Sequence, residues 1–86
     1  MLGDVDVIIF ILIACLSKTE KDTFNAIYKV HGNIEVHPLF GEWDIIAKFE
    51  IDTFEEIYTI VDIIHGITVD GVKSVTNTKT LTGIKF

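Results

Sequence analysis

Residues 36–51, VHPLFGEWDIIAKFEI, hold two strand-like runs joined by a turn at residues 41–44. The second run, from Trp43 to Ile51, alternates with the period of two that is typical of a pleated strand. Pro38 has no backbone N–H to donate, so we expect the first run at a sheet edge or at a bulge. The stretch therefore predicts an antiparallel hairpin.

The chain on either side of the hairpin supplies the other elements. A ten-residue apolar run is followed by a capping-box spacing, Ser17 to Glu20, and by a helical pattern that ends near Gly32. A second capping-box spacing, Asp52 to Glu55, precedes a helical pattern that ends at Gly66, and Asp70-Gly71 marks a turn. The second helix is expected to carry an apolar stripe of Phe54, Ile57, Tyr58, Val61 and Ile64. The expected strands cover residues 7–16, 34–40, 43–51 and 72–81.

The order strand, helix, strand, strand, helix, strand predicts one α+β domain over residues 1–86. Two split βαβ halves make a ferredoxin-like βαββαβ fold, with a four-stranded antiparallel sheet and both helices on one face. Right-handed crossovers place the first and third strands at its centre.

The first strand is apolar on both of its sides, although the helices can cover only one face of the sheet. The second face would be a large exposed apolar patch on a monomer. Nearly half of the residues, 49%, are apolar, which also favours self-association in a chain this short. We therefore expect a dimer that forms sheet to sheet, with the sheets about 10 Å apart. Lys48 and Glu50 share a face of the third strand, so that interface should be polar towards one end.

Composition argues against several classes of partner. The net charge is -6 and arginine is absent, which disfavours direct nucleic-acid binding. The apolar run is too short for a membrane-spanning helix, which needs about 20 residues. Leu12 to Cys15 resembles a lipoprotein cleavage box, but Asp4 and Asp6 precede it where a signal peptide carries basic residues. A cytoplasmic location without membrane contact is the expectation.

No catalytic, metal or cofactor site is predicted. His31, His37 and His65 are not paired at metal-ligand spacing, and the lone Cys15 does not complete a zinc set. His31 and His65 each precede a glycine at a helix end, where a cation suits the helix dipole. No phosphate-binding glycine loop occurs, and no nucleophile has an evident base partner.

The hairpin turn is the candidate binding element. Gly41, Trp43 and Asp44 together offer a close-approaching backbone, a flat wall and an anion to a small ligand. The alternative is an ordinary hairpin with a turn glycine, one core tryptophan and one exposed aspartate.

From about Val5 to Leu81 the chain resembles the effector-binding domain of the Lrp/AsnC family, the RAM domain. The likeness rests on the aliphatic first strand, the helix ending in His31-Gly32, the segment GEWDIIAK at 41–48, and DGVK at 70–73. Full-length family members also carry an N-terminal helix-turn-helix segment, for which this chain has no matching residues, and the family includes stand-alone effector domains. The resemblance therefore implies a stand-alone effector domain.

The resemblance also implies dimers through facing sheets, assembly into tetramers or octamers, and a small amino acid bound between dimers. In it, the backbone of Gly41 approaches the ligand, Trp43 shapes the pocket, and Asp44 receives the amino group or holds the hairpin. Polar residues of the last strand contribute in the family, although Val75 stands where many relatives have threonine, and the threonines here also suit an edge strand. The ligand-binding residues that it implies are Gly41, Glu42, Trp43, Asp44, Ser74, Thr76 and Thr78.

Three functional hypotheses follow. The first is an amino-acid-binding regulatory module that acts through ligand-dependent assembly on transcription or a metabolic partner, including a full-length Lrp/AsnC regulator. The second is a purely oligomerising structural subunit without a ligand. The third is a small enzyme of the dimeric α+β barrel type, which would require a deep cavity within one subunit lined by histidine and tryptophan.

Overall fold

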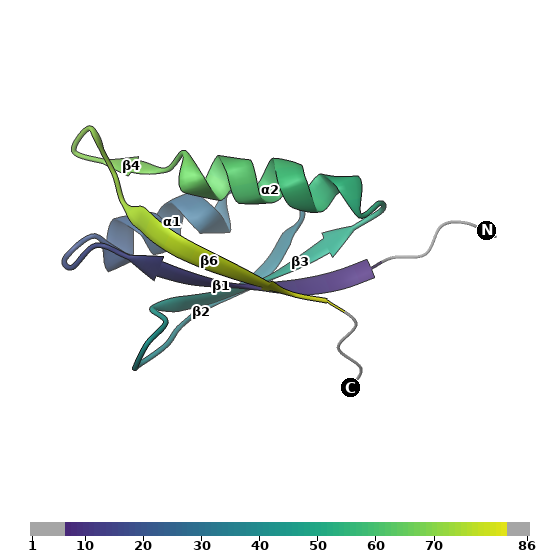
Figure 1. Ribbon diagram of the computed structural model, residues 1–86, viewed down its shortest axis with the longest axis horizontal. Coiled ribbons are helices and arrows are strands. Elements are labelled where there is room, and N and C mark those ends of the chain that lie inside the picture. The colour runs from purple at the N-terminus through teal and green to yellow at the C-terminus, as the bar shows by residue number, and fades with distance from the viewer. Residues whose placement is uncertain (1–6, 83–86) are drawn as a thin grey trace.

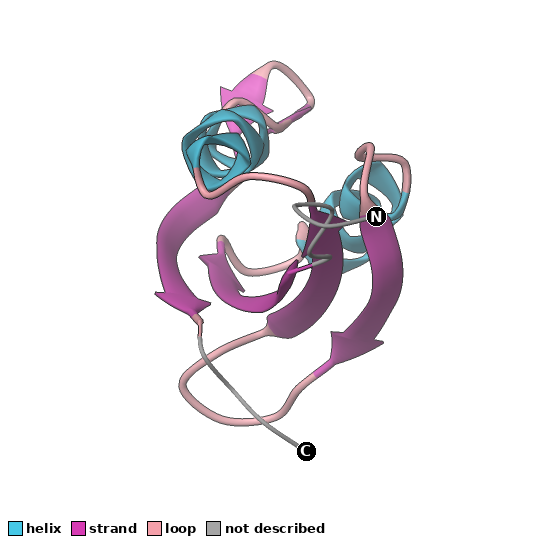
Figure 2. Ribbon diagram, turned by 90° about the vertical axis from the view of Figure 1, so that its right-hand side faces the viewer, coloured by secondary structure: helices cyan, strands magenta, loops and turns pink. Residues whose placement is uncertain are grey.

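The computed structural model describes residues 7–82, so Asp4 and Asp6 lie outside the described part. Its elements are β1 (Val7–Cys15), α1 (Glu20–Tyr28), β2 (Asn33–Pro38), β3 (Ile45–Ile51), α2 (Glu55–His65), β4 (Thr68–Val69), β5 (Val72–Lys73) and β6 (Val75–Leu81). The four long strands form an antiparallel sheet in the order β2-β3-β1-β6. Both helices lie on one face of this sheet (Figures 1 and 2). The ferredoxin-like prediction is confirmed, with β1 and β3 at the centre.

The core lies between the helices and the sheet. On β1, Ile9, Ile11 and Ile13 are fully buried, and alternate residues of β3 are buried with them. Ile27 of α1 and Ile64 of α2 reach the same layer. Fully burying one such side chain contributes about 1.5–3 kcal/mol relative to leaving it exposed, so this layer is a large favourable contribution to folding.

The opposite face of the sheet carries no helix (Figure 2). Here β1 presents Ile8, Phe10, Leu12 and Ala14, each of them partly exposed. Directly opposite residues of a sheet share a face, and Leu12 lies opposite Ile46 of β3 and Lys79 of β6. The prediction that the first strand is apolar on both sides is therefore confirmed.

The predicted capping boxes are wrong in detail. Lys18 has a left-handed backbone, with φ of 72°, so the chain turns just after Ser17 and Glu20 becomes the first residue of α1. The side chain of Thr19 instead donates to the carbonyl oxygen of Leu16 at 2.6 Å. At α2 the reach-back acid is Glu56, one residue later than predicted, and its carboxylate accepts the backbone N–H groups of Asp52 and Thr53.

The apolar stripe of α2 is also only partly as predicted. Phe54 and Tyr58 are 59% and 76% exposed, whereas Ile60, which was not in the stripe, is buried beside Ile64. The helix begins at Glu55, so Phe54 precedes the first helical residue. It is therefore not part of the helix side that packs against the sheet.

The last predicted strand is divided. Asp70 and Gly71 both have positive φ, the geometry of a tight two-residue hairpin, and they join β4 to β5. The chain then breaks at Ser74, whose carbonyl oxygen accepts the Leu16 N–H at 2.8 Å, before β6 begins. As predicted, Pro38 lies in an edge strand, β2.

Candidate functional site

The hairpin loop is anchored through Asp44. Its backbone carbonyl accepts the Leu39 N–H at 2.8 Å, and its own N–H donates to the carbonyl of Ile13 at 2.9 Å. The Oδ2 atom of its carboxylate accepts the Cys15 N–H at 2.8 Å in a partly buried position. Because β3 begins at Ile45, Trp43 and Asp44 belong to the loop rather than to the predicted strand. Asp44 thus ties the hairpin to the end of β1.

The tip of the hairpin is open to solvent. Gly41 has φ of +113°, a conformation that favours glycine, and beyond its two chain neighbours no described atom lies within 4 Å of the position that a Cβ would take. Glu42 is exposed, and Trp43 is partly buried. Phe40, at 104% of its reference area, is fully exposed.

A pocket of about 280 Å³ lies between the first turn of α1 and the base of the hairpin. Its apolar wall is made by Phe24, Pro38 and Ile45. The charged residues Glu20, Lys21 and Asp44 form the rest of the pocket lining. The arrangement places both signs of charge beside an apolar surface, which is what a zwitterion with an apolar side chain requires.

The predicted residues of the last strand lie elsewhere in the subunit. Ser74 is fully buried, and its hydroxyl accepts a hydrogen bond from Thr23 at 2.8 Å. The Thr76 hydroxyl donates to the carbonyl of Ala14 at 3.1 Å, and the Thr78 hydroxyl lies 3.0 Å from Nε2 of His65. None of these three residues lines the pocket, and β1 lies between β6 and the β2–β3 hairpin.

Sequence reasoning missed the α1 side of the pocket. Phe24 follows the helical spacing of a core residue, and a lysine beside a glutamate at a helix start is an ordinary surface pattern. Nothing in the hairpin sequence indicates these α1 residues, because more than a dozen residues of chain separate them from the hairpin residues that line the same pocket. Next to the pocket, burial raises the pKa of the Cys15 thiol, and the negative charge of Asp44 adds to this effect.

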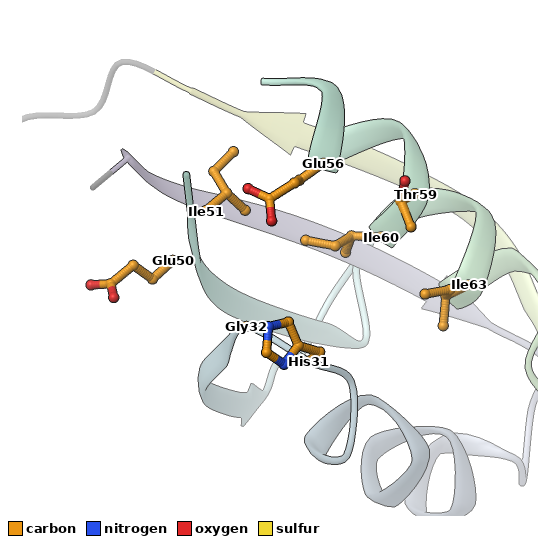
Figure 3. Close-up of a pocket in the computed structure, with 8 residues that line it drawn as sticks. All are labelled: His31, Gly32, Glu50, Ile51, Glu56, Thr59, Ile60 and Ile63. Carbon is orange, nitrogen blue, oxygen red and sulfur yellow. The ribbon is translucent and has the colours of Figure 1, made fainter. Parts of the chain in front are cut away.

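A second pocket, of about 110 Å³, lies at the other end of the helices (Figure 3). Gly32 has φ of +90° there, and a Cβ at this position would be 3.1 Å from the Glu50 carbonyl oxygen. The pocket is lined by His31, Gly32, Glu50, Ile51, Glu56, Thr59, Ile60 and Ile63. It contains a histidine but no tryptophan, so it is not the cavity that the enzyme hypothesis requires. Within residues 7–82, no group of three candidate ligands is placed to hold a metal ion.

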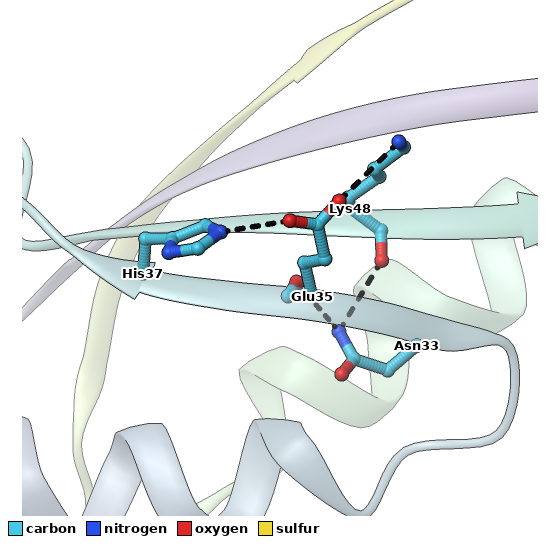
Figure 4. A network of polar contacts seen from close by, with 4 residues as sticks. All are labelled: Asn33, Glu35, His37 and Lys48. Atoms are coloured by element: carbon cyan, nitrogen blue, oxygen red, sulfur yellow. Dashed lines mark hydrogen bonds and ion pairs between the residues drawn. The ribbon is translucent and has the colours of Figure 1, made fainter.

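A polar network occupies the β2 edge of the helix-free face (Figure 4). Glu35 lies 3.1 Å from Nε2 of His37 and 3.3 Å from Nζ of Lys48. These two partners hold the pKa of the Glu35 carboxyl below its usual value. Nζ of Lys48 also lies 6.0 Å from the centre of the Phe10 ring. As predicted, Lys48 and Glu50 share this face, where they lie opposite Phe10 and Ile8 of β1. That they make an interface polar at one end stays a prediction.

Neither a protein-family model nor a curated protein sequence matches this chain. Among the described residues, neither helix has the length and apolarity that crossing a membrane requires.

Solved structures do match. The protein TTHA0845 from Thermus thermophilus is 21% identical, with a TM-score of 0.81 over 93% of this chain and 95% of that one. Escherichia coli AsnC is 22% identical, with a TM-score of 0.75 over 99% of this chain and 54% of AsnC. The Neisseria meningitidis transcriptional regulator NMB0573, in its complex with L-methionine, is 15% identical, with a TM-score of 0.71 over 95% of this chain and 52% of that one. At these identities the likeness shows the fold, which is the RAM-like fold found in AsnC-type regulators.

Proposed function

We propose that this chain is a regulatory domain of the Lrp/AsnC type that binds a small amino acid and changes its assembly in response. It acts in the cytoplasm on transcription or on a metabolic partner, without contacting DNA itself. The shared fold with AsnC and with a regulator solved in complex with L-methionine supports this proposal. No catalytic role is part of it.

The pocket beside Asp44 is the observation that carries the proposal. A free amino acid presents an ammonium group, a carboxylate and a side chain. Asp44 and Glu20 suit the ammonium group, and Lys21 suits the carboxylate. The wall of Phe24, Pro38 and Ile45 suits an apolar side chain. A volume of about 280 Å³ lies just below the range of about 300–1,000 Å³ for small-molecule sites, as expected for so small a ligand.

In this proposal the predicted residues divide into three groups. Gly41, Glu42 and Trp43 form the loop around Asp44, so they act from the same subunit. Thr76 and Thr78 lie on β6, beyond the central strands, so they contribute only from a second subunit across an interface. Ser74 keeps its structural bond to Thr23.

Assembly is proposed to start at the helix-free face. The strip formed by Ile8, Phe10, Leu12 and Ala14 runs along the middle of the sheet, with Ile46 beside it on β3. A second copy with the same strip is the partner of matching chemistry, because a two-fold axis places identical strips against each other. Lys48 of β3 lies opposite Phe10, within this face, and its ion pair with Glu35 on the edge strand β2 leads from the strip to the polar rim.

A thermal-shift screen of the common amino acids tests the ligand. A ligand at about 100 times its Kd adds about 2.7 kcal/mol to stability. The Asp44→Asn variant should fold, because the amide oxygen can still accept the Cys15 N–H, but it should lose most of the response. Asp62→Asn, an exposed aspartate on α2, is the matched control and should respond as wild type does. If no amino acid raises the melting temperature of the wild-type chain, the proposal is wrong and the oligomerising-subunit hypothesis is favoured.

A further inference from the structure

Phe40 is the most exposed large apolar side chain among the described residues. It stands at the hairpin tip, between the paired residue Leu39 and the open position of Gly41. A single exposed apolar residue is ordinary on a protein surface. What distinguishes Phe40 is that an apolar pocket lies at the base of the same hairpin.

That pocket has a volume of about 280 Å³. Its apolar wall includes Pro38, two residues before Phe40 in the chain, and Ile45, which follows the loop. Phe40 does not line the pocket of its own subunit, because its side chain points into solvent. Protruding ring and receiving pocket thus lie at one end of the molecule, which is the arrangement that two copies related by a two-fold axis can satisfy reciprocally.

The charges at this end are partly complementary. Glu42, two residues after Phe40, is exposed at the tip, and Lys21 lies on the pocket rim. A ring that enters the pocket therefore brings an acid towards a base. Glu20 on the same rim opposes this contact. The Asp44 carboxylate also lies there, with one oxygen already bonded to the Cys15 N–H.

We infer that the pocket of one copy receives Phe40 of a second copy, and the reverse, with Glu42 of each beside Lys21 of the other. The pocket is formed by α1 and the hairpin, on the helix side of the sheet, so it stays accessible when the helix-free face is covered. The contact would therefore join sheet-to-sheet dimers into larger assemblies. The inference depends on the pocket and on the exposed hairpin tip, and it does not depend on the proposal that an amino acid binds. An amino acid that binds against the same apolar wall would compete with Phe40 of the second copy.

Sedimentation velocity over a range of concentrations tests the contact in the full chain. Phe40→Ser should raise the Kd of the association step beyond the sheet dimer by at least about tenfold, because a buried phenylalanine is lost from each side. Phe54→Ser is the matched control. It removes another exposed phenylalanine, at the opposite end of β3 from the hairpin, and should leave the Kd unchanged. Equal behaviour of Phe40→Ser and wild type, an equal loss in both variants, or no such association step in the wild type would overturn the inference.

A charge exchange provides a second test. Lys21→Glu and Glu42→Lys should each weaken the association, and the double variant should recover most of the loss. Failure of the double variant to recover would refute the placement of Glu42 beside Lys21. The amino-acid proposal is tested separately, because Phe40→Ser leaves the pocket intact. Its thermal response to an amino acid should persist, so loss of assembly and loss of ligand binding are distinguishable.

Discussion

Replacing Asp44 by alanine should loosen the hairpin by a predictable amount. The carboxylate accepts the Cys15 N–H at 2.8 Å, in a partly buried position at the end of β1. Alanine leaves this N–H without its acceptor, and an unsatisfied buried donor costs about 1–3 kcal/mol. Because water reaches the site in part, we expect the lower part of this range, about 1–2 kcal/mol. For a domain of this size, each kcal/mol lowers the melting temperature by about 4–8 °C.

The asparagine variant separates the hydrogen bond from the charge. Its amide oxygen can accept the same N–H, and a bond to a neutral acceptor is roughly half as strong as one to a carboxylate. Asp44→Asn should therefore lose about half as much stability as Asp44→Ala, or less. Urea unfolding followed by far-UV circular dichroism gives both values, and Trp43, the one tryptophan of the chain, reports on the hairpin itself.

Amide hydrogen exchange locates the effect. The Cys15 N–H should exchange much faster in Asp44→Ala than in Asp44→Asn, while the buried centre of β1 should change only with global stability. If alanine and asparagine destabilise equally, or if alanine has no effect, the carboxylate of Asp44 does not anchor the hairpin.

Three further perturbations have expected outcomes. Leu12→Lys, at the middle of the helix-free face, should abolish the sheet dimer in sedimentation experiments without unfolding the subunit, since the side chain is only partly buried; a dimer that persists contradicts the proposed interface. Gly32→Ala should lower stability by about 1–3 kcal/mol, because φ is +90° there, while Gly66→Ala, with a φ of -84°, serves as the control in the same thermal unfolding assay. The pKa of Glu56 is lowered chiefly by the backbone N–H of Thr53, so its ionised form favours the folded state. That contribution is present above the ordinary value of 4.5 and is lost as the pH falls through the lower folded-state pKa, so Glu56→Gln should flatten the acid side of the stability curve; an unchanged curve would contradict this assignment.

The fold was predictable because its determinants are local or periodic. Right-handed crossovers place β1 and β3 at the centre of the sheet, and Pro38 favours an edge position or a bulge for β2, which together match the observed strand order. The helix starts were wrong by a residue or so because neighbouring polar side chains compete for the same cap, whereas the division of the last strand involves a distant contact. The break at Ser74 accompanies a bond from Leu16, far away in the chain, and no pattern in the last strand announces it.

The candidate site was predictable only on its hairpin side. A glycine, an aromatic residue and an acid at a turn form a recognisable local group, and Asp44 does lie at a pocket. The opposite wall comes from α1, where Phe24 has the spacing of any core residue. Only the packing of α1 against the β2–β3 hairpin shows that the Phe24 ring stays partly exposed in the pocket, where a ligand or a neighbouring subunit can reach it.

The two roles predicted for Asp44, holding the hairpin and receiving an amino group, are compatible in this geometry. A carboxylate has two oxygens, and the bond to the Cys15 N–H uses Oδ2. An ammonium group at the other oxygen would therefore act on a residue that is already tied to the end of β1. The neighbouring residue, Ala14, lies on the helix-free face through which the dimer is proposed to form. Ligand binding and assembly would then share one rigid connection, the last two residues of β1, which is the physical requirement for one to influence the other.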